Sequence, residues 1–294
     1  MAAPPLPSRY ARAATRPTAW WLEKLRQRAE RMADDELDLK APVELSVEAR
    51  EAALNFFNAA FRAEESGLRQ AHELAEQFEA RDPDLAETLR LYGDEEGWHR
   101  ELLTEFLGWL GGGVKPMGRV TRTLYRLYGG AKAMDSIVLT NLMFETIGST
   151  TYRLTLRRVA QPEFKRMLTV LTRDESFHVP LNVHFLREVM KDEGKLSRLK
   201  LRALHRLLFY TLVLLPLASR PKAGAFDGIG RLELMRAYAT HLAELSDELQ
   251  DLGLKRPRWL LAALGAAPRP VTRVADIDAA ERFADRSRVR VQEL

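Results

Sequence analysis

The sequence predicts an all-α protein, and three observations support this class. Apolar residues recur every three or four positions along most of the chain, as they do on one face of an α-helix. Glycine and proline gather mainly between these periodic segments, where helices would end. Two of the segments also carry the same pattern, acid–Glu–small–aromatic–His, at residues 95–99 and 174–178.

Composition narrows the class of protein. The chain has 294 residues, of which 46% are hydrophobic and 29% charged, which is normal for a soluble globular protein. The net charge of +4 is spread over segments that also carry acids, so we expect no nucleic-acid partner. Cysteine is absent, which excludes disulfides, thiolate metal sites and iron–sulfur clusters and suits the cytoplasmic location that we expect.

The ends and the apolar stretches also carry expectations. Residues 1–18 are rich in Ala, Pro and Arg and lack the apolar core of a secretion signal, so we expect a disordered arm. No apolar run reaches the roughly 18–20 residues that span a bilayer. The nearest, residues 207–218, is too short and contains Pro216.

The periodic segments and their breaks give the expected helices. An opening amphipathic helix has a basic outer face, Ser46 is a suitable N-cap for the next helix, and Asp82–Pro83 marks a turn. The expected helices are residues 20–37, 46–80, 84–110 and 131–160, with a further helix that begins at Pro162. The Gly- and Pro-containing segment 114–130 separates the helices expected at 84–110 and 131–160.

The repeated pattern indicates a metal site. Residues i and i+3 share a helix face, so Glu96 projects with His99 and Glu175 with His178. Glu64 lies 32 residues before Glu96, and Glu145 lies 30 residues before Glu175. Both of these acids interrupt an apolar stripe, and a buried carboxylate is costly unless it is paired or binds a metal. About thirty residues form one arm of a helix, a turn and an antiparallel helix that runs back. All four glutamates would therefore lie at the same level along the bundle.

Between residues 46 and 189 the sequence therefore resembles the ferritin-like di-iron carboxylate superfamily. This resemblance implies a ferritin-like four-helix bundle that binds two iron ions, with manganese or a mixed pair as alternatives. Segment 114–130 would then be the long crossover between the second and third helices of this bundle. The implied ligands are Glu64, Glu96, His99, Glu145, Glu175 and His178, with Glu96 and Glu175 bridging. Glu65 is the alternative to Glu64, which is favoured because Gly67 follows it as Gly148 follows Glu145.

The resemblance also implies roles for residues around the ligands. Asp174 would accept a hydrogen bond from the ring of His99, and Glu95 one from the ring of His178, which fixes the tautomers. Gly67, Gly148 and Ser149 would leave room for dioxygen or substrate, although close helix packing explains the glycines equally simply.

The expected function is oxidation of an organic substrate by hydroxylation, desaturation or N-oxygenation, with dioxygen and an external electron donor. The chain is longer than a ferritin subunit and lacks the Cys-rich domain of rubrerythrins, and its extra helices could cap a substrate pocket. Leu171 stands where N-oxygenases carry an extra His ligand, which weakens N-oxygenation. The alternatives are a ferritin-like iron oxidation and storage protein and a non-catalytic helical interaction protein.

The expected organisation is a bundle with an N-terminal extra helix at residues 19–194, appended helices at 195–270 and a polar tail at 271–294. The basic segment 195–206 precedes the apolar segment 207–218, which favours a core helix with a solvated face. An acyl or carrier-bound substrate and contact with a membrane surface are the alternatives. A homodimer is a further expectation.

Overall fold

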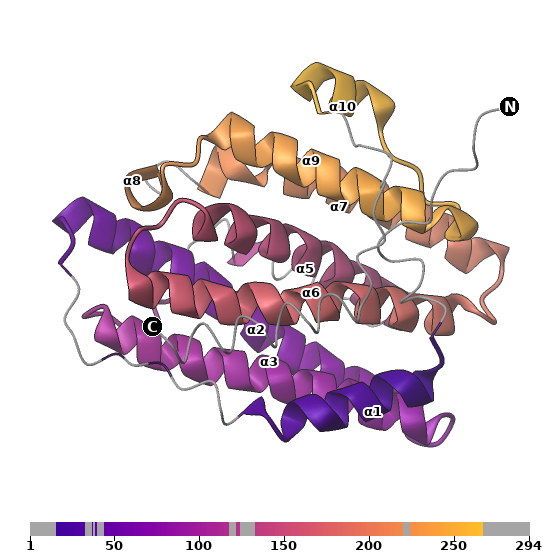
Figure 1. Cartoon of the computed structure of the whole chain (residues 1–294). Coiled ribbons are helices and arrows are strands. Elements are labelled where there is room, and N and C mark those ends of the chain that lie inside the picture. Colours follow the sequence, from indigo (N-terminus) through magenta and orange to yellow (C-terminus); the bar gives the residue numbers. More distant parts are fainter. Residues whose placement is uncertain are drawn as a thin grey trace, which may run out of the picture.

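Four long helices form the centre of the molecule (Figure 1). The computed structural model describes residues 16–32, 37, 39, 44–117, 122–123, 133–219 and 224–266. The central helices are α2 (Val47–Phe78), α3 (Pro83–Trp109), α5 (Met134–Leu156) and α6 (Pro162–Met190). Helix α2 packs along α3 and α5 along α6, and the two pairs face each other. The predicted all-α bundle is confirmed.

The helices begin and end where the sequence places helix-terminating chemistry. The Ser46 hydroxyl accepts a hydrogen bond from the Ala49 amide at 3.2 Å, and the Asp82 carboxylate accepts one from the Leu85 amide at 3.0 Å. Pro83 and Pro162 occupy first-turn positions, where the missing N–H is not needed. Gly111 ends α3 with a φ of 77°, a conformation that glycine adopts without a Cβ clash.

Two helices are shorter than the sequence predicts. Helix α1 (Thr18–Ala29) stops eight residues before the expected end at 37, and α5 ends at Leu156 instead of 160. The chain needs residues 157–161 to reverse direction, and a residue before proline avoids the helical region, so α5 cannot continue to Pro162. The predicted arm lies mostly, the tail entirely and the crossover largely outside the described residues.

The buried core consists of two apolar clusters separated by polar residues. One cluster includes Ala71, Leu89 and Phe177, and the other includes Phe61, Leu102 and Leu171. In α2, α3 and α6 the switch from one cluster to the other falls at the segment that carries the predicted ligands. The acids and histidines therefore form a polar layer across the middle of the bundle.

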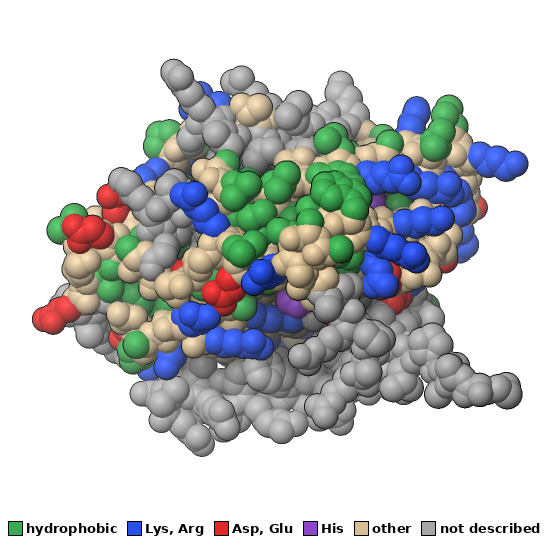
Figure 2. Space-filling view, turned by 90° about the horizontal axis from the view of Figure 1, so that it is seen from above, with side chains coloured by type: hydrophobic (Ala, Val, Ile, Leu, Met, Phe, Trp, Pro, Cys, Tyr) green, Lys and Arg blue, Asp and Glu red, His purple; other side chains and the backbone are tan. Residues whose placement is uncertain are grey.

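The remaining helices cover two sides of the bundle. Helix α1 packs against α3, while α7 (Lys195–Ser219) and α9 (Arg231–Glu248) pack on α5, with α10 (Arg258–Leu264) on α9 (Figure 1). In sequence, the short helix α8 (Gly224–Asp227) lies between α7 and α9, and η3 (Gln250–Leu252) lies between α9 and α10. Figure 2 looks down on the α9 and α10 side.

Helix α7 unites the basic and apolar segments that the sequence separates. By length and composition alone, residues 195–218 could cross a membrane, which corrects the expectation that this stretch is too short. The reason is that the helix begins at Lys195, twelve residues before the apolar run. Its buried face, which includes Leu208 and Leu212, belongs to the same core as α5 and α9, the pattern of a helix within a folded protein.

Candidate metal centre

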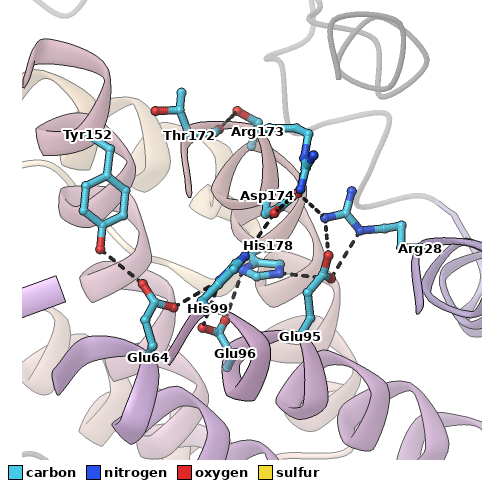
Figure 3. A network of polar contacts seen from close by, with 11 residues as sticks. Arg28, Glu64, Glu95, Glu96, His99, Tyr152, Thr172, Arg173, Asp174 and His178 are labelled. Carbon is cyan, nitrogen blue, oxygen red and sulfur yellow. Dashed lines mark hydrogen bonds and ion pairs between the residues drawn. The ribbon is translucent and has the colours of Figure 1, made fainter. Parts of the chain in front are cut away.

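All six predicted ligand residues meet in the polar layer. The His99 Nδ1 atom lies 3.3 Å from Glu64 Oε2 and 3.9 Å from Glu96 Oε2. The His178 Nδ1 atom lies 3.0 Å from Glu96 Oε1, so the Glu96 carboxylate lies close to both imidazoles (Figure 3). Glu145, Glu175 and His178 form a second group whose nearest donor atoms all lie within 4.8 Å of one another.

Both imidazoles turn Nδ1 toward the other ligands and Nε2 toward an outer carboxylate. His99 Nε2 lies 3.0 Å from Asp174 Oδ2, and His178 Nε2 lies 3.3 Å from Glu95 Oε2. These are the two pairings that the resemblance implied. With the proton on Nε2 donated outward, Nδ1 of each ring offers its lone pair to the centre.

The carboxylates at the centre have too few partners. Both oxygens of Glu96 and one oxygen each of Glu145 and Glu175 are buried without a hydrogen bond within the described structure, as is His178 Nδ1. The 3.0 Å approach of His178 to Glu96 is therefore an ion-pair distance without hydrogen-bond alignment. Unsatisfied buried acceptors cost about 1–3 kcal/mol each, so this cluster is unfavourable unless a cation fills it.

The net negative charge of the carboxylate cluster also favours the binding of cations. Four ligand carboxylates with Glu95 and Asp174 make six negative charges, and two guanidinium groups, those of Arg28 and Arg173, contact the outer pair. Four negative charges remain when both histidines are neutral, and two divalent ions would balance them. Carboxylate and imidazole donors suit iron or manganese. The residues present therefore fit a dinuclear centre.

A sequence profile of the rubrerythrin family matches residues 55–182, which contain all six predicted ligand residues. This segment is a ferritin-like domain of the di-iron carboxylate superfamily. Searches of curated proteins and of solved structures gave no match to the chain. The match supports iron binding by this domain, in a family whose di-iron members are typically redox enzymes, and the assignment of each ligand within it is our proposal.

Burial and interactions between neighbouring charged groups shift the pKa values of the side chains at the centre of the ferritin-like domain. Burial and the charge of Glu145 raise the pKa values of Glu96 and Glu175 well above the usual range. Burial lowers the pKa of His99, but hydrogen bonds to Asp174 and Glu64 outweigh it and bring the value to about 10. In the absence of metal, protons would take the place of cations between these groups.

Two arginines hold the outer carboxylates of the domain in place. Arg28, from the last turn of α1, contacts Glu95 and donates to Asp174 at 2.7 Å, so one side chain joins both outer acids (Figure 3). Arg173 donates twice to Asp174, at 2.5 and 2.6 Å. Burial raises the pKa of Glu95, but the charge of Arg28 and the contact with His178 lower it to about 2. The outer acids are therefore anions that can accept from the histidines.

Two tyrosines orient the remaining ligand acids. The Tyr152 hydroxyl donates to Glu64 Oε1 at 3.1 Å, and the Tyr92 hydroxyl donates to Glu145 Oε1, also at 3.1 Å. Burial and nearby carboxylates raise both tyrosine pKa values, so both hydroxyls stay protonated donors. The residue pattern alone does not predict these roles. A signal existed in hindsight, since Tyr92 lies one helical turn before Glu96.

The structure shows where the alternative ligand residue, the residue at the extra-ligand position and the other histidines lie. Glu64 is buried in the centre, whereas Glu65 points to the surface and pairs with Arg62 at 2.6 Å. Leu171 is buried among apolar side chains. The other histidines make structural contacts: His72 with Asp94, His184 with Thr18, His205 with Ser246 and His241 with Thr150.

A cavity of about 40 Å³ lies between α2 and α5 beside the ligand acids. Gly67 and Gly148 both line it. Ser149 is buried and does not line this cavity, so its place beside dioxygen or substrate stays a prediction. Successive helical residues point about 100° apart, so Ser149 turns away from the side on which Gly148 meets the cavity.

Proposed function

We propose that this protein is a di-iron oxidoreductase that uses dioxygen to oxidise an organic substrate by hydroxylation, desaturation or N-oxygenation. The six central residues would hold two iron ions, which would supply the electrons for dioxygen reduction and would be re-reduced by an external electron donor. The observation that carries the proposal is the cavity that reaches Glu64, Glu145 and Glu175. An iron-replete form would then have a space for reactants directly beside the metals.

The size and lining of the cavity favour a small neutral guest. About 40 Å³ exceeds the space of one water molecule, so dioxygen or one end of a larger substrate would fit. Apart from the three ligand acids, the described lining carries no charge: it includes Phe144, Gln70 and Thr140. A path for ferrous iron toward a storage core would be expected to present further carboxylates, so the lining supports substrate oxidation over iron storage.

Residues around the centre would hold the proposed ligands in position and keep water away from them. Tyr92 and Tyr152 fix the carboxylates of Glu145 and Glu64 through O–H donors, while Glu95 and Asp174 fix the two histidines. The apolar clusters on both sides of the polar layer exclude water from the bundle. Preorganised ligands of this kind need little rearrangement during reaction.

The test is a substitution that narrows the cavity and leaves every proposed ligand in place. Ala63 lines it, and Ala63→Leu should keep the iron content but slow dioxygen consumption by the reduced protein and the turnover of a panel of fatty acyl, phenolic and arylamine substrates. Ala59→Leu adds the same side chain at an exposed position of α2 and should change neither. Iron oxidation that builds a mineral core, with no substrate turnover and no effect of Ala63→Leu, would refute the proposal.

A further inference from the structure

The outer side of α7 carries an apolar stripe along its whole length. The helix buries one face against the core, including Leu201, Leu208 and Leu212. The opposite face presents leucines that are 42–65% exposed and repeat at helical spacing: Leu196, Leu199, Leu207, Leu214 and Leu217. Single exposed leucines are ordinary, but a continuous stripe of them marks an interaction surface.

Helix α10 adds an aromatic side chain to this stripe. Trp259 is 64% exposed, and its ring stacks on Tyr210 of α7 with 5.6 Å between centroids. Its Nε1 atom donates to the Tyr210 hydroxyl at 3.0 Å, so the indole is held at the surface. Tryptophan and tyrosine are enriched where a protein meets the interface of a membrane with water.

Four of the five cations of α7 have no acidic partner among the described residues. Neither α7 nor α10 contains Asp or Glu, and α7 alone contributes Lys195, Arg198, Lys200, Arg202 and Arg206. Within the described structure no ion pair joins Lys195, Lys200, Arg202 or Arg206 to a carboxylate. Arg256, before α10, does pair with Asp247 at 2.7 Å. Figure 2 shows the result: hydrophobic side chains gather on this side of the molecule, and Lys and Arg crowd beside them.

We propose that the α7–α10 face, made of the exposed leucines of α7, Trp259 and the α7 cations, docks on the surface of a bilayer that contains anionic lipids. An apolar stripe flanked by cations and an exposed indole is the pattern of a helix that lies in the interfacial plane. The buried face of α7 packs on α5 and α9, so the helix would lie on the bilayer and not cross it.

The charge of the α7–α10 face favours an anionic lipid surface over a second copy of the chain as its partner. Two copies that met through this face would bring the cations of one α7 close to those of the other, without acids on either helix to compensate. Like charges in contact oppose association, whereas each Lys or Arg near an anionic lipid surface contributes about 1 kcal/mol, or roughly fivefold in affinity. The charge pattern therefore favours lipid.

The experiment is vesicle flotation with the full-length, iron-loaded protein. Vesicles of phosphatidylcholine alone are compared with an equal mixture of phosphatidylcholine and phosphatidylglycerol. The wild type should float with the mixture and not with phosphatidylcholine alone. Lys200→Glu with Arg206→Glu should weaken the apparent affinity by about thirtyfold or more. Lys165→Glu with Arg69→Glu changes the net charge equally on α6 and α2 and should leave binding unchanged.

A second variant tests the apolar contribution. Leu207→Ser with Leu214→Ser should weaken binding at least tenfold, whereas Val47→Ser, at an exposed position of α2, should not. All the changed residues are exposed, and circular dichroism and iron content verify that each variant is folded. Failure of the wild type to float, or equal loss in the control variants, would overturn the proposal. Vesicle-independent dimers that the Leu207 and Leu214 changes dissolve would assign the face to self-association. Dioxygen consumption without vesicles tests the proposed function separately.

Discussion

Gly67 offers a sharp test of the centre because a single methyl group at this position would meet a proposed ligand. A Cβ atom built on Gly67 would lie 3.2 Å from both Cγ and Cδ of Glu96 and 3.4 Å from its Oε2. Ordinary contacts of a Cβ begin near 3.4 Å, so the Glu96 side chain must move by a few tenths of an ångström. Gly67→Ala should therefore displace the carboxylate that we propose bridges the metals, without removing it.

The expected magnitude follows from the tolerance of metal coordination. Metal–ligand distances hold to within about 0.2 Å, and disturbing the support of a ligand typically reduces metal affinity by about 10- to 100-fold. We expect at least a tenfold loss of affinity. The backbone should not suffer, because alanine is favoured over glycine inside a helix by about 1 kcal/mol.

Gly148→Ala is the matched control. Gly148 follows Glu145 by three residues, as Gly67 follows Glu64, but a Cβ there would meet only Tyr152 Cε2 at 3.9 Å. Iron retained per chain is measured anaerobically against increasing chelator for both variants and the wild type. Gly148→Ala should match the wild type. Equal retention by Gly67→Ala and Gly148→Ala would refute the placement of Glu96 at the metals.

Two further predictions concern stability. Arg28→Ala removes the cation that joins Glu95 and Asp174 and should lower the free energy of unfolding by about 3 kcal/mol. Arg26→Ala, which breaks only an exposed pair with Glu87, should have little effect in the same urea titration, and equal effects would contradict the role of Arg28. Burial lowers the pKa of His184 to about 4, so the unfolded chain binds its proton more readily and stability falls as pH drops from about 6.5 toward 4. Between pH 8 and pH 5 the loss should be about 2 kcal/mol. Thermal melts of the wild type and His184→Gln should differ in slope over this window, and identical slopes would exclude the buried neutral imidazole.

The central bundle could be predicted because local chemistry and helical periodicity agree there. Ser46, Asp82 and Pro162 start helices in the structure as their residue types predict. The proposed ligand set follows from the sequence because Glu64 and Glu145 interrupt apolar stripes, and the structure brings both acids to the two Glu–His pairs. Helix ends were less predictable: the end of α5 depends on how many residues the chain needs to reverse, which periodicity does not report.

The surroundings of the centre were mostly hidden from the sequence. Arg28 belongs to a basic helix whose other cations face outward, and only the packing of α1 on α3 turns this one toward Glu95. Tyr92 and Tyr152 have the spacing of core residues, and their hydroxyls acquire roles only because helices distant in sequence place Glu145 and Glu64 opposite them. Long-range contacts of this kind have no local signature.

The most direct test of the dinuclear centre is the metal content of the purified protein. Protein from cells supplied with iron and manganese is analysed by elemental analysis, beside Glu175→Ala and the control Glu65→Ala. The account predicts about two metal ions per chain in the wild type and in Glu65→Ala, and their loss in Glu175→Ala. A wild type that lacks stoichiometric metal, or a Glu175→Ala protein that keeps both ions, would contradict it.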